Sequence, residues 1–212
     1  MAMKSDGRVL LVIDVQNDFC PGGSLAVEQG DEVVPVINAL MTKFSRVVAT
    51  QDWHPVDHVS FASSHEGRKV LDTIEAEGIR QVLWPDHCVQ GTRGADIHPR
   101  LDTRGIGLLL RKGMRRNLDS YSAFFENDKK TETGLKPYLK GFKIREVFVC
   151  GLATDYCVFS TAMDARRLGF DVTVIPDACR GVDFPRGNIE LSLAEMRKAG
   201  VLLMESTKLD GR

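Results

Sequence analysis

Cys157 stands where a sulfur nucleophile gains reactivity, at the start of an expected helix. The apolar run 146–150 before it is typical of a buried strand, and apolar residues recur at helical spacing after it. Residues 151–154 are therefore expected to form a strand-to-helix turn, with Thr154 as the N-cap. In the first turn of a helix the N–H groups lack intrahelical partners, and the helix dipole favours a thiolate. Such a cysteine suits acyl transfer, because the sulfur attacks a carbonyl while N–H groups hold the oxyanion.

Two further ionisable residues end apolar runs. Asp14 ends the run 8–14, and Lys112 stands near the end of the run 106–113. In a parallel sheet these ends meet at one edge, where sites form, so we expect Asp14, Lys112 and Cys157 to lie together. The carboxylate can remove the thiol proton and later give a proton to a leaving amine, while the lysine keeps the carboxylate ionised and lowers the thiol pKa. These residues predict a cysteine hydrolase whose base is an aspartate.

Asp52 and His54 form a second candidate site just after the apolar run 46–51. Residues two apart in extended backbone point to the same side, so a carboxylate and an imidazole can bind one ion there. His58 and His87 are both candidates for a third ligand. Three such ligands leave positions open for water or substrate, as in catalytic zinc sites. Taken alone, the pair is explained equally well by a carboxylate that orients a histidine.

Phe19 and Trp84 lie in expected loops. They either pack under a long loop or form a slot for a planar ring, which gains ~1 kcal/mol from stacking beyond the area buried. The remaining cysteines and two further histidines are interpreted as structural or surface residues: Cys20, Cys88, Cys150, Cys179, His65 and His98.

The elements that must position these residues alternate between strand and helix. Strands are expected at residues 8–14, 46–51, 106–113, 146–150, 171–177 and 201–204, and helices at 31–41, 135–140, 157–168 and 189–199. This alternation predicts one three-layer α/β/α domain over residues 1–212, with a mostly parallel six-stranded sheet. The segment 52–104 shows no sustained period and is interpreted as a long metal-binding insertion with short helices of its own.

Composition excludes several classes of protein. The 212 residues carry 28 lysines and arginines against 29 acidic residues, and no basic stripe indicates nucleic acid. The sequence shows no membrane span, and five scattered cysteines predict a reducing cytoplasm rather than a disulfide framework. The expected partner is a small-molecule substrate, and homo-oligomerisation is left open.

Six segments together resemble the nicotinamidase (pyrazinamidase) branch of the isochorismatase-like cysteine hydrolase superfamily. They cover nearly the whole chain in order: residues 14–19, 51–62, 84–92, 112–113, 119–125 and 151–158. The resemblance implies an isochorismatase-like, Rossmann-like fold and hydrolysis of nicotinamide to nicotinate and ammonia in NAD salvage. Residues 64–82 match nothing in the family pattern.

The resemblance also implies a role for each matching residue. Cys157 would form a thioester, Asp14 would shuttle protons, and Lys112 would support both. The backbone N–H groups of Ala153 and Cys157 would form the oxyanion hole, and a cis peptide bond would precede Ala153. The metal ligands of the family match Asp52, His54 and His87, and in some members the residue that matches His58 is a ligand too. The residues that flank the ring match Phe19 and Trp84. The expected cofactor is a divalent metal ion, zinc before iron or manganese.

Three other functions compete with this one. The nearest is another amidohydrolase of the superfamily, acting on carbamoyl or ureido compounds, many of which lack the metal. A non-catalytic ligand-binding module would not need Asp14, Lys112 and Cys157 together. A redox-sensing thiol protein lacks support, because no Cys-x-x-Cys pair is present.

Overall fold

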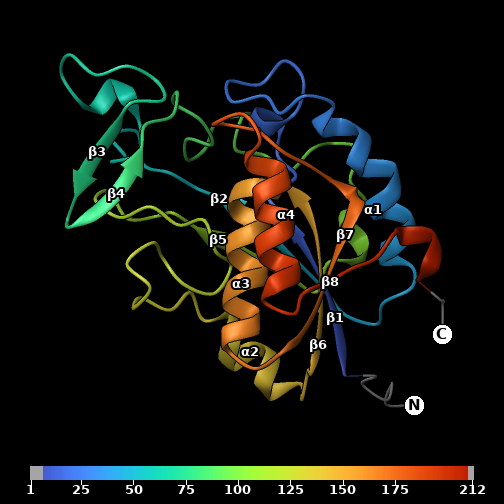
Figure 1. The fold of residues 1–212 in the computed structure, drawn as a ribbon. Coiled ribbons are helices and arrows are strands. Elements are labelled where there is room, and N and C mark those ends of the chain that lie inside the picture. The colour runs from blue at the N-terminus through green and yellow to red at the C-terminus, as the bar shows by residue number, and fades with distance from the viewer. Residues whose placement is uncertain (1–6, 210–212) are drawn as a thin grey trace.

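A six-stranded parallel sheet forms the centre of the computed structural model, which describes residues 7–209. The strand order is β5-β2-β1-β6-β7-β8, and every neighbouring pair is parallel, as the sequence predicted (Figure 1). The strands are β1 (Arg8–Ile13), β2 (Val47–Asp52), β5 (Leu108–Lys112), β6 (Glu146–Leu152), β7 (Asp171–Arg180) and β8 (Leu202–Leu203). All residues of β1 and β2 are buried, which explains the apolar runs at residues 9–13 and 47–49.

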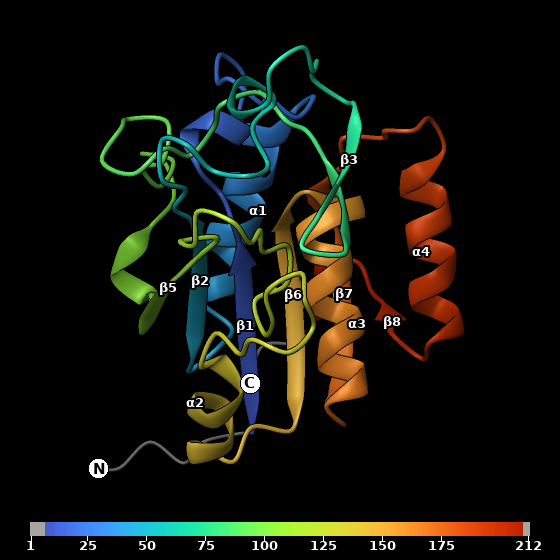
Figure 2. The same cartoon turned by 90° about the vertical axis from the view of Figure 1, so that its left-hand side faces the viewer.

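Helices cover both faces of this sheet. They are α1 (Val33–Met41), α2 (Leu135–Gly141), α3 (Phe159–Arg167) and α4 (Asn188–Lys198). Helix α1 lies on one face, and α3 and α4 pack side by side on the other (Figures 1 and 2). The three-layer prediction is therefore confirmed. Within residues 7–209, no helix combines the length and the apolar character that crossing a membrane requires.

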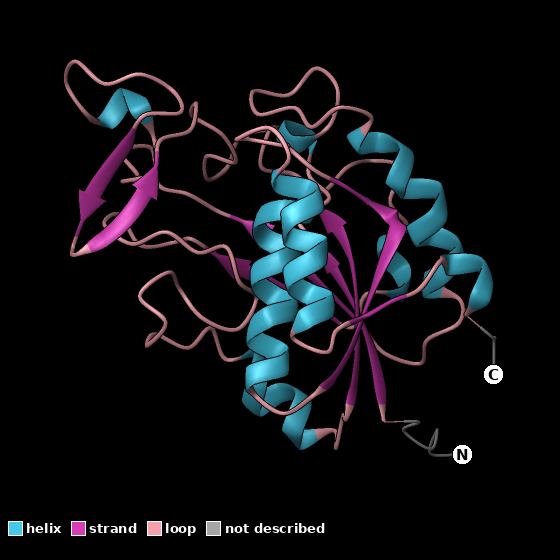
Figure 3. Ribbon diagram, in the orientation of Figure 1, coloured by secondary structure: helices cyan, strands magenta, loops and turns pink. Residues whose placement is uncertain are grey.

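The expectation of short helices for the long insertion was incomplete. Besides single 3₁₀ turns at residues 62–64 and 103–105, the insertion holds an antiparallel hairpin of β3 (Thr73–Ala76) and β4 (Ile79–Val82). Figure 3 shows this hairpin apart from the central sheet. Glu77 and Gly78 both have positive φ, the geometry of a tight two-residue hairpin turn.

The turn before α3 begins one residue earlier than predicted. Residues 154–158 form a single π-helical turn, and Ala153, in extended conformation, is its N-cap. The Ala153 carbonyl accepts hydrogen bonds from the N–H groups of Tyr156 and Val158. Thr154 is already inside the turn, so its predicted N-cap role was wrong.

Candidate active site

Four ionisable side chains converge at the carboxyl edge of the sheet. Asp14 follows β1, Asp52 and Lys112 end the paired strands β2 and β5, and Cys157 follows β6. All four are at least nine-tenths buried. Parallel strands deliver their carboxyl ends to one place, which is why residues so distant in sequence meet here.

Lys112 is the centre of this group. Its Nζ lies 2.9 Å from Asp14 Oδ2 and 2.5 Å from Asp52 Oδ1. It also donates to the Ser120 carbonyl at 2.8 Å and lies 3.5 Å from Cys157 Sγ. Burial disfavours the ammonium, but the two carboxylates outweigh it and hold the pKa of Lys112 well above its usual value. Lys112 is therefore a cation shared between the two carboxylates and the thiol.

Asp14 has an oxygen free to exchange a proton. Thr50 Oγ1 donates to Asp14 Oδ1 at 2.6 Å, whereas Oδ2 faces Lys112. A carboxylate oxygen of Asp14 and the sulfur of Cys157 lie within 4.8 Å of each other. Burial raises the pKa of Asp14 to about 6, against the lowering effect of Lys112. At neutral pH this carboxylate is ionised yet basic enough to accept a proton.

The Cys157 thiol differs from the sequence-based expectation. Burial raises its pKa well above the usual value, and Lys112 offsets only part of that increase. The prediction of a lowered thiol pKa was wrong, because desolvation exceeds the effects of the helix start and the lysine. The resting group is a neutral thiol, so attack requires removal of its proton by a base.

A group that could hold a metal ion adjoins the thiol. Asp52, His54 and His87 each place a ligand atom within 4.8 Å of the others. His54 Nδ1 pairs with the Gly113 carbonyl and His87 Nδ1 with the Pro85 carbonyl, both at 2.8 Å. These bonds leave each Nε2 available, the arrangement common for metal-bound histidines.

The protonation of Asp52 and His87 also fits a cation, whereas, against the effect of burial, the neighbouring Asp52 raises the pKa of His54 above its usual value. Burial and the neighbouring His54 lower the pKa of His87 to about 4, so its imidazole is neutral at pH 7. Burial works against ionisation of Asp52, but Lys112 and His54 hold the pKa of this carboxyl below its usual value. An ionised carboxylate and a neutral imidazole are the ligand forms that a divalent ion needs.

His58 lies behind this group. Its ring stacks on His54 with 4.1 Å between centroids, and its Nδ1 pairs with Ser60 Oγ at 2.7 Å. With His54 and Asp119 it forms a second cluster of ligand atoms within 4.8 Å. The sequence analysis assigned no role to Asp119, although it opens the matching segment 119–125.

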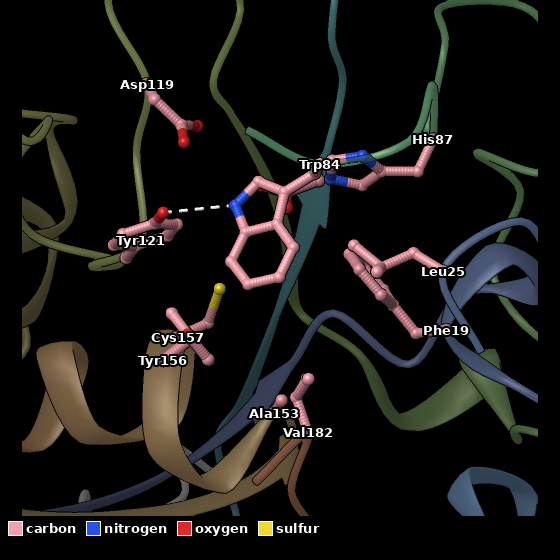
Figure 4. A pocket seen from close by; sticks show the side chains of 11 residues that line it. Phe19, Leu25, Trp84, His87, Asp119, Tyr121, Ala153, Tyr156, Cys157 and Val182 are labelled. Atoms are coloured by element: carbon pink, nitrogen blue, oxygen red, sulfur yellow. Dashed lines mark hydrogen bonds between the residues drawn. The ribbon is translucent and has the colours of Figure 1, made fainter. Parts of the chain in front are cut away.

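A pocket opens onto Asp52, His87, Asp119 and Cys157, and the other members of these groups lie behind its wall. Its walls include Phe19, Trp84 and Ala153, together with Cys157, as the sequence analysis anticipated (Figure 4). The indole N–H of Trp84 donates to the Tyr121 hydroxyl at 3.1 Å. The peptide bond between Leu152 and Ala153 is cis, as the resemblance implied. Besides Asp119, sequence reasoning missed four lining residues, none of which is an acid, base or thiol at a strand end: Leu25, Tyr121, Tyr156 and Val182.

Together, the parallel sheet and the buried cysteine pocket at its carboxyl edge define a hydrolase-like α/β protein. The model of the isochorismatase domain family matches residues 8–208, and the chain belongs to this family. A nicotinamidase of Acinetobacter baylyi is 50% identical over 206 residues, covering 97% of this chain and 96% of that protein.

Solved structures agree with this membership. A nicotinamidase/pyrazinamidase of Acinetobacter baumannii superposes with a TM-score of 0.94 at 47% identity, covering 99% of this chain and all of that one. A pyrazinamidase of Pyrococcus horikoshii in complex with zinc superposes with a TM-score of 0.77 at 33% identity, covering 94% of this chain and 99% of that one.

Proposed function

We propose that this protein is a metal-dependent nicotinamidase that hydrolyses nicotinamide to nicotinate and ammonia, a step of NAD salvage. The observation that carries the proposal is a pocket whose wall holds both the Cys157 thiol, which Asp14 and Lys112 contact from behind, and Asp52 and His87. With His54, Asp52 and His87 form the ligand set. The nicotinamidase relative, at 50% identity over nearly the whole chain, supports this substrate. Pyrazinamide, a ring of the same size, is a further expected substrate.

In the first half of the reaction the thiol proton passes to Asp14 as Cys157 Sγ attacks the carboxamide carbon. The resulting oxyanion is held by the backbone N–H groups of Ala153, the N-cap of the π-helical turn, and of Cys157 within that turn. The C–N bond then breaks, and Asp14 gives its proton to the leaving nitrogen, so that ammonia departs and a thioester remains.

In the second half a water molecule attacks the thioester. Asp14 takes one proton from the water, and the carbon–sulfur bond breaks to release the carboxylic acid, which ionises to nicotinate. The proton on Asp14 returns to the sulfur and restores the thiol. Lys112 keeps its charge throughout, and its ammonium, 2.9 Å from Asp14, holds that carboxylate ionised between the two transfers.

The remaining lining residues would hold the ring. Phe19 and Trp84 provide its flat walls, while Asp52, His54 and His87, with His58 behind them, would hold a divalent ion, zinc before iron or manganese. Bound there, such an ion would supply a Lewis acid for the ring, and the walls of the pocket would orient the carboxamide toward Cys157. The five free, buried cysteines fit an enzyme of the reducing cytoplasm.

Ammonia release from nicotinamide tests this proposal. The assay compares wild-type protein, Cys157→Ala and wild-type protein treated with a chelator and then resupplied with zinc. We expect release from wild type alone, its loss in the other two samples, and recovery on resupply. Cys157→Ala should still bind nicotinamide, because the substitution removes the nucleophile and leaves the walls.

The alternative substrates form the other arm of the assay. If metal-loaded wild type releases no ammonia from nicotinamide but hydrolyses carbamoyl or ureido compounds, the nicotinamidase proposal is wrong and the alternative amidohydrolase is correct. Full activity in metal-free protein would likewise contradict the metal-dependent mechanism.

A further inference from the structure

Asp155 is a buried aspartate with only 5% of its surface exposed, and it lies two residues before the Cys157 nucleophile. Its Oδ1 accepts a hydrogen bond from the N–H of Val182 at 2.9 Å. Its Oδ2 accepts from the N–H of Asp183 at 2.9 Å and from Asn188 Nδ2 at 3.1 Å. The carboxylate therefore joins the turn that carries the nucleophile to the segment 181–188 before α4.

Two other contacts hold the same segments together. The Tyr156 hydroxyl donates to the Phe184 carbonyl at 2.6 Å. A Cβ built on Gly181 would come within 3.0 Å of Asp155 Oδ1 and 2.5 Å of Ile189. The segment 181–184 thus packs tightly against the turn, and a glycine is required where the two meet.

Val182 is the member of this segment that reaches the pocket. It lines the cavity that contains Cys157 and is itself only half-buried, as are Leu25 and Tyr156. The catalytic thiol and the ligand His87 are buried. The half-exposed lining residues therefore form the rim of the pocket, and Asp155 holds the rim residue Val182 by accepting a hydrogen bond from its backbone N–H.

We propose that Asp155 is a positioning residue that sets substrate specificity: by fixing Val182 at the rim, it restricts the pocket to small, unsubstituted aromatic carboxamides. This inference rests on the proposed function. An asparagine at this position keeps one acceptor oxygen but places an NH2 group against donors that the second carboxylate oxygen accepted from, so the segment must move to find other partners. A displaced Val182 widens the rim and also loosens the ring relative to Cys157, which lowers the rate for the small substrate.

The test compares Asp155→Asn and Val182→Ala with wild type and with a matched control, Asp164→Asn. Asp164 is a buried aspartate on α3 that pairs with Lys129 and Arg167 and does not line the pocket. kcat and KM are measured for nicotinamide and for 5-methylnicotinamide. Asp155→Asn is expected to lower kcat/KM for nicotinamide by roughly tenfold or more, and to lower the preference over the methylated ring by about tenfold.

The two comparison variants separate specificity from stability. Val182→Ala should reduce the same preference, whereas Asp164→Asn should lower the melting temperature and leave the preference unchanged. If Asp155→Asn and Val182→Ala both keep the wild-type preference, or if Asp164→Asn changes it equally, the inference is overturned.

A second readout is independent of the substrate. The rate at which Cys157 is alkylated is measured with iodoacetamide and with the bulkier N-phenylmaleimide, and Cys157→Ala gives the background from the other thiols. Asp155→Asn and Val182→Ala should both raise the ratio of the N-phenylmaleimide rate to the iodoacetamide rate above the ratio measured for Asp164→Asn. If wild type does not hydrolyse nicotinamide, the proposed function fails, but this ratio still decides the role of Asp155; an unchanged ratio refutes it.

Discussion

Replacing Lys112 with methionine would remove the one ammonium that lies between two buried carboxylates. Methionine keeps most of the length and apolar volume of the lysine stem. It leaves Asp14 and Asp52 facing each other without the cation that lies 2.9 Å from one and 2.5 Å from the other. The Ser120 carbonyl also loses its donor. We therefore expect Lys112→Met to be strongly destabilising.

The size of this effect can be worked from the distances. Two unit charges 2.9 Å apart attract by ~6 kcal/mol at an effective dielectric constant of 20. The cost of desolvating the ammonium offsets part of that attraction. Removing one partner of a buried ion pair typically costs ~3–5 kcal/mol, and we expect this range for Lys112→Met at pH 8. A domain has only ~5–15 kcal/mol in total, so the loss is a large fraction of the stability.

Urea unfolding of chelator-treated protein measures this loss. The matched control is Lys129→Met, whose ammonium pairs with Asp164 at 3.0 Å but is 45% exposed, so its removal should cost ~1 kcal/mol or less. At pH 5 the cost of Lys112→Met should shrink, because an uncompensated carboxyl has a raised pKa and becomes protonated. Adding Asp14→Asn to Lys112→Met should restore part of the stability. A Lys112→Met loss at pH 8 no larger than that of Lys129→Met would refute this reasoning.

Three further predictions follow from buried polar groups. Since the pKa of Asp14 is raised to about 6 and its ionised form is the proposed base, kcat/KM should fall about tenfold per pH unit below that value; a flat initial-rate profile down to pH 5 would contradict this. Burial raises the pKa of Glu126 from 4.5 to about 7, so the stability that its protonated form contributes is complete below pH 4.5 and is lost as the pH rises through 7. In urea unfolding, Glu126→Gln should therefore be more stable than wild type by ~2 kcal/mol at pH 8 and equal to it at pH 4.5. Gln81→Leu removes a 2.9 Å hydrogen bond to Asp119, a lining residue, and should raise KM about tenfold with a smaller change in kcat, whereas Arg80→Gln, on the exposed side of the same strand, should leave both constants unchanged.

The sheet was predictable because its strands are buried on both faces. Buried parallel strands contain continuous apolar runs, and the wholly buried β1 and β2 have such runs at residues 9–13 and 47–49. The hairpin β3–β4 was missed for the opposite reason. Its strands have only four residues each: β3 alternates exposed and half-buried side chains, β4 buries only the polar Gln81, and the charged Glu75 lies opposite Arg80. Such a pair has too little apolar pattern to be distinguished from a loop.

The pKa values of the site residues were less predictable than which residues form the site. The apolar runs indicate that Asp14, Lys112 and Cys157 share one edge, because that follows from strand direction alone. The pKa of the thiol depends on how completely the rest of the fold excludes water, and no local pattern reports that quantity. Burial therefore reversed the expected direction for Cys157 while leaving its location as predicted.

The contacts of Asp52 link the two halves of the site. One carboxylate oxygen lies 2.5 Å from Lys112, which also contacts Asp14 and Cys157, and the other lies 3.7 Å from His54 Nε2. A cation bound by Asp52 and the neighbouring histidines would therefore change the attraction between Asp52 and Lys112. Because Lys112 also contacts Asp14, it would change the proton affinity of Asp14 as well. Since all of these groups are buried, solvent screens the interactions weakly. Binding of a divalent ion to Asp52, His54 and His87 would thus be coupled to the basicity of Asp14, and Asp52 is the residue through which the coupling would pass.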